Sequence, residues 1–184
     1  MSRDSAAYFD AIDAIAGGTG HFYRITERDE SRVVAVVAYD DVPESGHCTA
    51  FSYGLSSAEH SEWLNGRPEL LISVGSTDHA WGLCMGEIIR ANRDSMLFSQ
   101  GTVLHFRQEV SAESKMTSFL VHVCTLLDGT DAKLSLPSRE VNFSQLYPIH
   151  ECEAAVIAQT GVDRFFWELG IDFYDVRRSP ATLQ

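Results

Sequence analysis

Basic side chains are scarce in this sequence of 184 residues. It has 14 lysines and arginines against 26 aspartates and glutamates, which gives a formal net charge of −12, and its lysines are Lys115 and Lys133 alone. A surface with this excess of negative charge repels nucleic-acid phosphates and anionic lipids. We therefore expect neither nucleic acid nor a membrane as a ligand. The charge fits two explanations equally well, attraction of a basic partner and solubility alone. A basic protein would be attracted most strongly.

Long apolar segments are also missing. No apolar run approaches the roughly 20 residues that a bilayer-spanning helix needs. The polar residues 1–5 lack the apolar segment of a secretory signal. These two absences predict a cytoplasmic protein. The four cysteines form no C-x-x-C motif and lie in apolar surroundings, which favours buried, unpaired thiols over disulfides or zinc ligands; they are Cys48, Cys84, Cys124 and Cys152.

Motifs for cofactors and metals are not found. The sequence contains no G-x-G-x-x-G, P-loop or kinase motif. Its seven histidines form no H-x-x-x-H, H-E-x-x-H or H-x-H pattern, so we predict no cofactor and no metal site. His150, Glu151 and Cys152 form the densest group of possible ligands. Here we favour helix capping, because His150 precedes a predicted helix and Glu153 lies near its third position.

One serine lies in a near-match to a hydrolase motif. Residues 54–58, "GLSSA", resemble the G-x-S-x-G turn that exposes a nucleophilic serine. That turn requires a helix directly after the serine, whereas the segment after Ser56 is short and polar. We favour a strand that bends at Gly54 into a loop, with Ser56 hydrogen-bonded to the following turn. A serine hydrolase that uses Ser56 is the remaining alternative, and we predict no catalytic residue.

Apolar periodicity predicts four helices and seven strands. The predicted helices are residues 5–16, 79–93, 151–160 and 163–169, and the predicted strands are 22–26, 32–39, 47–55, 69–74, 101–110, 117–127 and 141–149, the last broken by Pro148. Polar turns are predicted at 27–31, 40–46 and 65–68. Because helices and strands are segregated along the chain, we predict an α+β fold with a mixed, largely antiparallel central sheet and helices packed on it. The length fits one domain, residues 1–184.

Two glycines interrupt the predicted helix 79–93. Gly82 and Gly86 lie about one turn apart, and each costs about 1 kcal/mol of helix stability relative to alanine. This placement predicts that the helix backbone lies in close contact with another element.

Between about residues 30 and 180, an ordered set of motifs resembles the Suppressor of fused domain family, and in particular its compact, single-domain bacterial members. The matching residues are Tyr53-Gly54-Leu55-Ser56 for the aromatic-Gly-Leu-Ser corner, Glu69-Leu70-Leu71-Ile72 for the acidic-apolar strand, Pro148-Ile149 with Glu153 for the Pro-Ile-Thr-x-x-Glu motif, and Asp175 with Arg177 or Arg178 for the closing Asp…Arg pattern. His150 stands where the family usually has threonine.

This resemblance implies a protein-binding domain without catalysis. Animal members of the family bind and restrain a transcription factor, and bacterial members are commonly implicated as immunity proteins that neutralise toxins. Our leading hypothesis is an immunity protein that masks a basic toxin domain by tight binding, and the alternative is a regulatory adaptor that binds another protein. The partner-binding residues that we expect are acidic and aromatic loop positions: Asp40, Asp41, Glu44, Glu59, Glu62 and Trp63.

Overall fold

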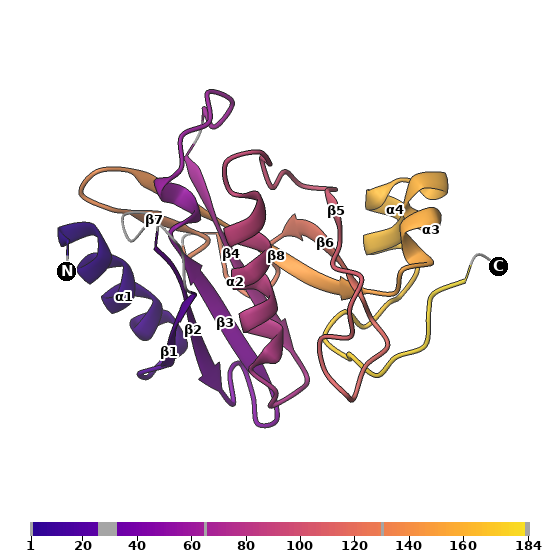
Figure 1. The fold of residues 1–184 in the computed structure, drawn as a ribbon. Coiled ribbons are helices and arrows are strands. Elements are labelled where there is room, and N and C mark those ends of the chain that lie inside the picture. The colour runs from indigo at the N-terminus through magenta and orange to yellow at the C-terminus, as the bar shows by residue number, and fades with distance from the viewer. Residues whose placement is uncertain (1, 26–32, 65, 130, 183–184) are drawn as a thin grey trace.

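The computed structural model describes residues 2–25, 33–64, 66–129 and 131–182, and these form one eight-stranded sheet with helices on both faces (Figure 1). The turn predicted at 27–31, the strand ends at 26 and 32, and Asn65 lie outside the described residues. The elements are α1 (Arg3–Ala16), β1 (His21–Ile25), β2 (Val34–Asp40), β3 (Cys48–Tyr53), the 3-10 helix η2 (Leu55–Ser57), β4 (Arg67–Val74), α2 (Ala80–Asn92), β5 (Val103–His105), β6 (Ser118–Val123), β7 (Lys133–Ser135), β8 (Glu140–Ile149), α3 (Glu153–Thr160) and α4 (Val162–Trp167).

The strands follow the order β1-β2-β3-β4-β8-β6-β5, and β7 pairs with the beginning of β8. Every pair of neighbours is antiparallel except β4 and β8, which run parallel. This topology confirms the predicted α+β fold with a mixed, largely antiparallel sheet. Among the described residues, no helix combines the length and the apolar composition that crossing a membrane requires.

The helices divide between the two faces of the sheet. Successive residues of β2 alternate, so that Val36 belongs to the same apolar cluster as Trp81 of α2, whereas Val37 belongs to the same cluster as Tyr8 of α1. Farther along the sheet, a third apolar cluster joins β6 and β8 to α3, α4 and the C-terminal segment. β2 is apolar on both faces because α1 and α2 cover it from opposite sides.

The contact predicted at the two helix glycines is confirmed. A Cβ atom added at Gly82 would lie 2.7 Å from the Cβ of Ala50, and one added at Gly86 would lie 2.8 Å from Val36 and Ile25 side-chain atoms. Real Cβ atoms do not approach other atoms so closely, so α2 can lie this near to the sheet only where it has no side chain. The two glycines thus lower the intrinsic stability of the helix but allow it to pack closely against β1, β2 and β3.

Several strand predictions need correction. The strand predicted at 101–110 is reduced to β5, because the backbone turns away from the sheet and Arg107 has a φ of 63°. The strand predicted at 117–127 ends at Val123 in β6. The three-residue strand β7 was not predicted, because it has too few residues for a periodic pattern. Arg67 and Pro68, predicted as a turn, are the first residues of β4.

The predicted break at Pro148 is wrong. β8 continues through Pro148 to Ile149, and Pro148 pairs with Phe119 of β6. Pairing with β4 ends earlier, at Leu146. Pro148 therefore occupies a position with one strand neighbour, where a residue without an N–H group is tolerated.

The prediction of four buried thiols is also only partly right. Cys48 of β3 and Cys84 of α2 are buried in the apolar cluster between α2 and the sheet. Cys124 is half-buried, and Cys152 is exposed. Cys152 is the residue directly before α3 and lies outside the helix face that packs on the sheet.

Candidate functional site

The corner that follows β3 contains the serine of the hydrolase-like motif. Gly54 has a φ of 113°, and an added Cβ would lie 2.3 Å from the carbonyl oxygen of Val33. Glycine is therefore required where the chain leaves the strand. The next residues form the one-turn helix η2, and its central residue, Ser56, is fully buried. The predicted bend at Gly54 is confirmed, and a 3-10 turn replaces the predicted strand end at Leu55.

A buried carboxylate organises this corner. Glu69, in β4, is fully buried and accepts four hydrogen bonds. The donors are Ser52 Oγ at 2.6 Å, the Gly54 backbone N–H at 2.9 Å, the Ser56 backbone N–H at 2.9 Å and Ser56 Oγ at 2.7 Å. Burial raises the pKa of the Glu69 carboxyl, although the hydrogen bonds oppose this shift. The hydrogen bond predicted from Ser56 to the following turn is wrong, because its hydroxyl donates to Glu69.

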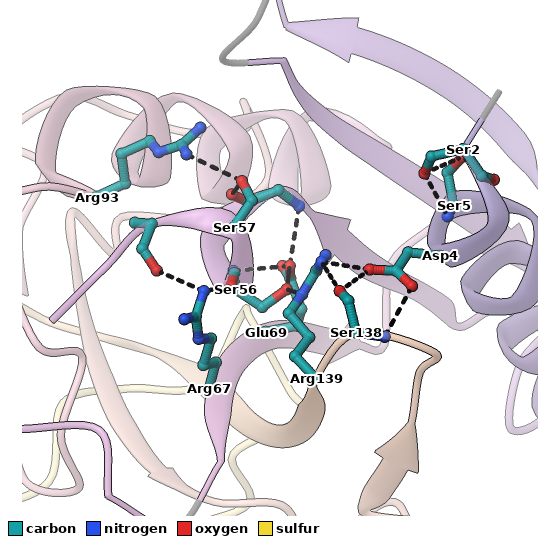
Figure 2. A network of polar contacts seen from close by, with 12 residues as sticks. Ser2, Asp4, Ser5, Ser56, Ser57, Arg67, Glu69, Arg93, Ser138 and Arg139 are labelled. Carbon is teal, nitrogen blue, oxygen red and sulfur yellow. Dashed lines mark hydrogen bonds and ion pairs between the residues drawn. The ribbon is translucent and has the colours of Figure 1, made fainter.

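Arg139 joins the same corner to the N-terminal helix (Figure 2). Its Nε donates to Ser56 Oγ at 3.0 Å, and its Nη1 lies 2.7 Å from Oδ2 of Asp4 in α1. Ser56 Oγ is thus enclosed between a carboxylate and a guanidinium, and among the described residues no histidine hydrogen-bonds to it. This geometry favours a structural role for Ser56 over a nucleophilic one.

The expected partner-binding residues occupy two separate surfaces, at opposite ends of β3. Asp40, Asp41 and Glu44 lie at the end of β2 and in the turn that leads into β3, whereas Glu59, Glu62 and Trp63 lie in the loop between η2 and β4. A six-residue strand is about 20 Å long. Figure 1 shows the two loops at opposite ends of the sheet. The structure therefore brings together the residues of each group but separates the two groups.

At the first surface, each of the three carboxylates has a local partner. Asp40 contacts His21 Nε2 at 3.1 Å and His79 Nε2 at 2.6 Å, and Asp41 Oδ1 accepts a hydrogen bond from the Gly46 N–H at 2.8 Å. The hydrogen bond with His79 lowers the pKa of the Asp40 carboxyl, and the one with His21 acts in the same direction. Glu44 is the most exposed of the three, with 75% of its side chain in solvent, and its Oε1 lies 3.8 Å from His47 Nδ1.

The second surface combines an apolar side chain with acidic neighbours. Trp63 is half-buried; its Nε1 donates to the Leu97 carbonyl at 3.2 Å, and its ring lies 4.4 Å from that of His60. Leu64, the next residue, is 83% exposed. Trp63 and Leu64, together with Glu62 and residues 97–100, line a hollow of about 300 Å³. Leu64 was not among the expected partner-binding residues, because two adjacent apolar residues in a polar loop form no periodic pattern.

The helix-capping prediction near the C-terminus is half right. Glu153 is the first residue of α3 and not its third, but its carboxylate accepts a hydrogen bond from the His150 N–H at 2.8 Å, the side-chain contact that a capping box makes. The His150 side chain does not cap α3, because its Nε2 contacts the Arg178 carbonyl at 2.9 Å. Glu153 is fully buried and pairs with the Arg178 guanidinium at 2.5 and 2.9 Å. The arginine of the closing Asp…Arg motif is therefore Arg178, and it pairs with the buried Glu153.

Comparison with known proteins agrees with this fold. The sequence model of the Suppressor of fused protein (SUFU) family matches residues 29–179. A search of curated proteins finds no match. A solved structure of a putative SUFU homolog from Neisseria gonorrhoeae FA 1090 is similar to this chain with a TM-score of 0.75 and 16% identity, over 99% of this chain and 98% of that one.

Two further solved structures are similar. One comes from the crystal structure of the Sufu–Fu complex, with a TM-score of 0.69 and 14% identity over 97% of this chain and 92% of that one. The other is Drosophila Suppressor of Fused, with a TM-score of 0.70 and 14% identity over 97% of this chain. This chain covers 51% of the Drosophila chain. At these identities, the three structures show a shared fold.

Proposed function

This chain belongs to the Suppressor of fused family, and we propose that it is a protein-binding domain whose partner docks on the hollow beside Trp63 and Leu64. The observation that carries the proposal is the exposure of Leu64, 83%, at the rim of a hollow lined by Trp63. A large apolar side chain so exposed is stabilised when a partner covers it, and apolar or aromatic anchors of this kind dominate the energy of many interfaces.

The charge around the hollow indicates the chemistry of the partner. Glu59 and Glu62 are exposed on the same loop, and the whole chain has a net charge of −12. A basic protein surface would be steered toward this loop, and close opposite charges would increase the association rate. We infer that the partner is a basic toxin domain and that this protein is an immunity protein, which neutralises the toxin by covering its active surface.

Co-expression with the product of the adjacent gene tests this function. We expect the wild-type protein to restore growth to cells that produce this gene product as a toxin, and to co-purify with it in a stable complex. Leu64→Asp should weaken the complex by about 2 kcal/mol or more, as expected for an interface anchor. Because Leu64 is almost fully exposed, this substitution should leave the free energy of unfolding unchanged.

Two charge-reversal variants test the role of the acidic loop, and the second is the matched control for the first. Glu59→Lys/Glu62→Lys should slow association and reduce its dependence on salt concentration. Asp128→Lys/Asp131→Lys changes the net charge equally at exposed positions between β6 and β7, and it should have a smaller effect. Failure to restore growth, together with the absence of a complex, would contradict the immunity function.

The alternative is a regulatory adaptor that binds a protein other than a toxin. A relative with the same fold forms a complex with Fu, and this observation favours the adaptor. If this alternative is correct, the adjacent gene product would be harmless to cells, and Leu64→Asp would disrupt a complex with a different protein. Growth measurements with the adjacent gene expressed alone distinguish the two functions.

A further inference from the structure

Three possible metal ligands from distant parts of the sequence meet on the face of the sheet that α2 covers. His21 begins β1 and pairs with Ala38 of β2, and Asp40 lies two residues beyond Ala38. Because cross-strand partners and residues two apart share a face, His21 and Asp40 lie on the same face as Ala38. His79 directly precedes α2, and this position brings its ring to the same end of the sheet.

The three side chains direct their ligand atoms at one another. His79 Nε2 lies 2.6 Å from Asp40 Oδ1, and His21 Nε2 lies 3.1 Å from Asp40 Oδ2. One ligand atom of each residue lies within 4.8 Å of the other two. The described residues contain no other such group of three. His21 and Asp40 are exposed, so that an ion can reach the group from solvent.

A fourth side chain orients one of the imidazoles. Tyr23 Oη lies 2.7 Å from Nδ1 of His79, on the side of the ring opposite to Nε2. A tyrosine hydroxyl both donates and accepts hydrogen bonds, so it can accept the Nδ1–H of a histidine whose Nε2 binds a metal. Contacts of this kind select the tautomer and the ring orientation of metal-binding histidines.

We propose that His21, Asp40 and His79 bind Zn²⁺ through the two Nε2 atoms and one carboxylate oxygen, with Tyr23 as a positioning residue. Tetrahedral zinc has bonds of about 2.0–2.1 Å to these ligands, which places neighbouring ligand atoms about 3.3 Å apart. Small side-chain movements therefore convert the two hydrogen bonds into coordination bonds. Each imidazole binds in its neutral form, and the protons displaced from Nε2 move to Nδ1 or to water.

The ligand set also selects the ion. Two of the three ligands are imidazole nitrogens, which suit zinc and other late transition metals, whereas Ca²⁺ and Mg²⁺ prefer oxygen ligands. Three protein ligands leave the fourth position of a tetrahedral zinc ion open to water. The sequence predicted no metal site, because residues 21, 40 and 79 form no short motif.

Isothermal titration of the untagged chain with zinc chloride tests the proposal. The protein should carry Cys152→Ser, because Cys152 is an exposed thiol that could itself bind zinc. We expect saturable binding of one zinc ion per chain and a higher Tm in the presence of zinc. Calcium or magnesium chloride at the same concentration should give neither effect.

Three variants identify the ligands. His21→Ala should abolish saturable binding, and because 60% of the His21 side chain is exposed, the circular dichroism spectrum and the Tm without metal should not change. Tyr23→Phe should lower the zinc affinity about 10- to 100-fold and keep the one-to-one stoichiometry. His105→Ala is the matched control, since His105 contacts Glu151 at 3.0 Å without a second imidazole; it should bind zinc as tightly as the parent protein.

Two results would overturn the proposal: no saturable zinc binding by the parent protein, or unchanged binding after His21→Ala. The site is independent of the proposed partner surface, because the two lie at opposite ends of β3. Loss of partner binding in Leu64→Asp therefore leaves the zinc measurement unaffected.

Discussion

Ser56 donates its hydroxyl hydrogen to Oε1 of Glu69 at 2.7 Å, inside the protein and across 13 positions of sequence. The same oxygen of Glu69 accepts the backbone N–H groups of Gly54 and Ser56. One carboxylate thus holds the whole corner between β3 and η2 against β4. This contact explains the corner motif Tyr53-Gly54-Leu55-Ser56. The motif supplies the glycine for the bend and the serine for the hydrogen bond.

Glu69→Ala should destabilise the protein by about 3 kcal/mol or more. The substitution removes the acceptor of four buried hydrogen bonds, and a buried donor without a partner costs about 1–3 kcal/mol. Urea unfolding measures the change in the free energy of unfolding. Glu62→Ala is the control, since this glutamate is exposed and its removal should change stability by no more than about 0.5 kcal/mol. Equal losses from the two variants would refute the role assigned to Glu69.

Arg178→Met should destabilise the protein by about 3–5 kcal/mol at pH 7, because it leaves the buried Glu153 without its charge partner. Burial raises the pKa of Glu153, but its hydrogen bonds and the Arg178 charge outweigh burial and place the pKa below the ordinary value of 4.5. A carboxyl with a lowered folded pKa stabilises the protein above its unfolded pKa, and this stability is lost as the pH falls through the folded pKa.

The difference in stability between wild type and Arg178→Met should therefore be largest near pH 7 and should shrink below pH 4.5. Urea unfolding at a series of pH values measures this difference. Arg164→Met is the control, because Arg164 and Glu168 form an exposed pair at 3.6 Å, and its loss should cost less than about 1 kcal/mol. A difference that does not vary with pH would contradict the assigned ion pair.

Gly86→Ala should destabilise the protein by about 1–3 kcal/mol, although alanine is the better helix former by about 1 kcal/mol. The added methyl group would lie 2.8 Å from Val36 and Ile25 side-chain atoms and would push α2 away from the sheet. Thermal unfolding measures the effect. Ala91→Gly, at an exposed position of the same helix, reports the propensity change without the contact. A stabilised Gly86→Ala variant would show that the helix has room to move.

The four thiols should react with Ellman's reagent in the order of their exposure. Cys152 is exposed and should react first, and the half-buried Cys124 should follow more slowly. Burial raises the pKa of Cys48 to about 12 and also raises that of Cys84, so neither forms the reactive thiolate at neutral pH. Both should react only after unfolding in urea. Fast reaction of more than two thiols in the native protein would contradict the described packing.

The accuracy of the sequence-based predictions followed the length and regularity of each pattern. The helix predicted at 79–93 is observed as Ala80–Asn92, since an apolar stripe over several turns is a strong local signal. The strand predicted at 32–39 is observed as β2, Val34–Asp40, since a run of strand-forming apolar residues is also a clear local signal. The strands around residues 101–110 and 117–127 were predicted too long, since apolar residues there also pack in loops outside the sheet.

Local patterns in the chain were therefore enough to predict the α+β class, the principal helices and the corner at Gly54, because periodicity and backbone conformation depend on near neighbours. The partners of the polar side chains depended on strand order and register instead. Glu69 was predicted as the start of a strand, but only the pairing of β3 with β4 places its carboxylate under η2. The register of β1 and β2, with α2 above them, likewise brings together His21, Asp40 and His79. These contacts could not be predicted from short motifs, because such motifs contain only residues that are close together along the chain.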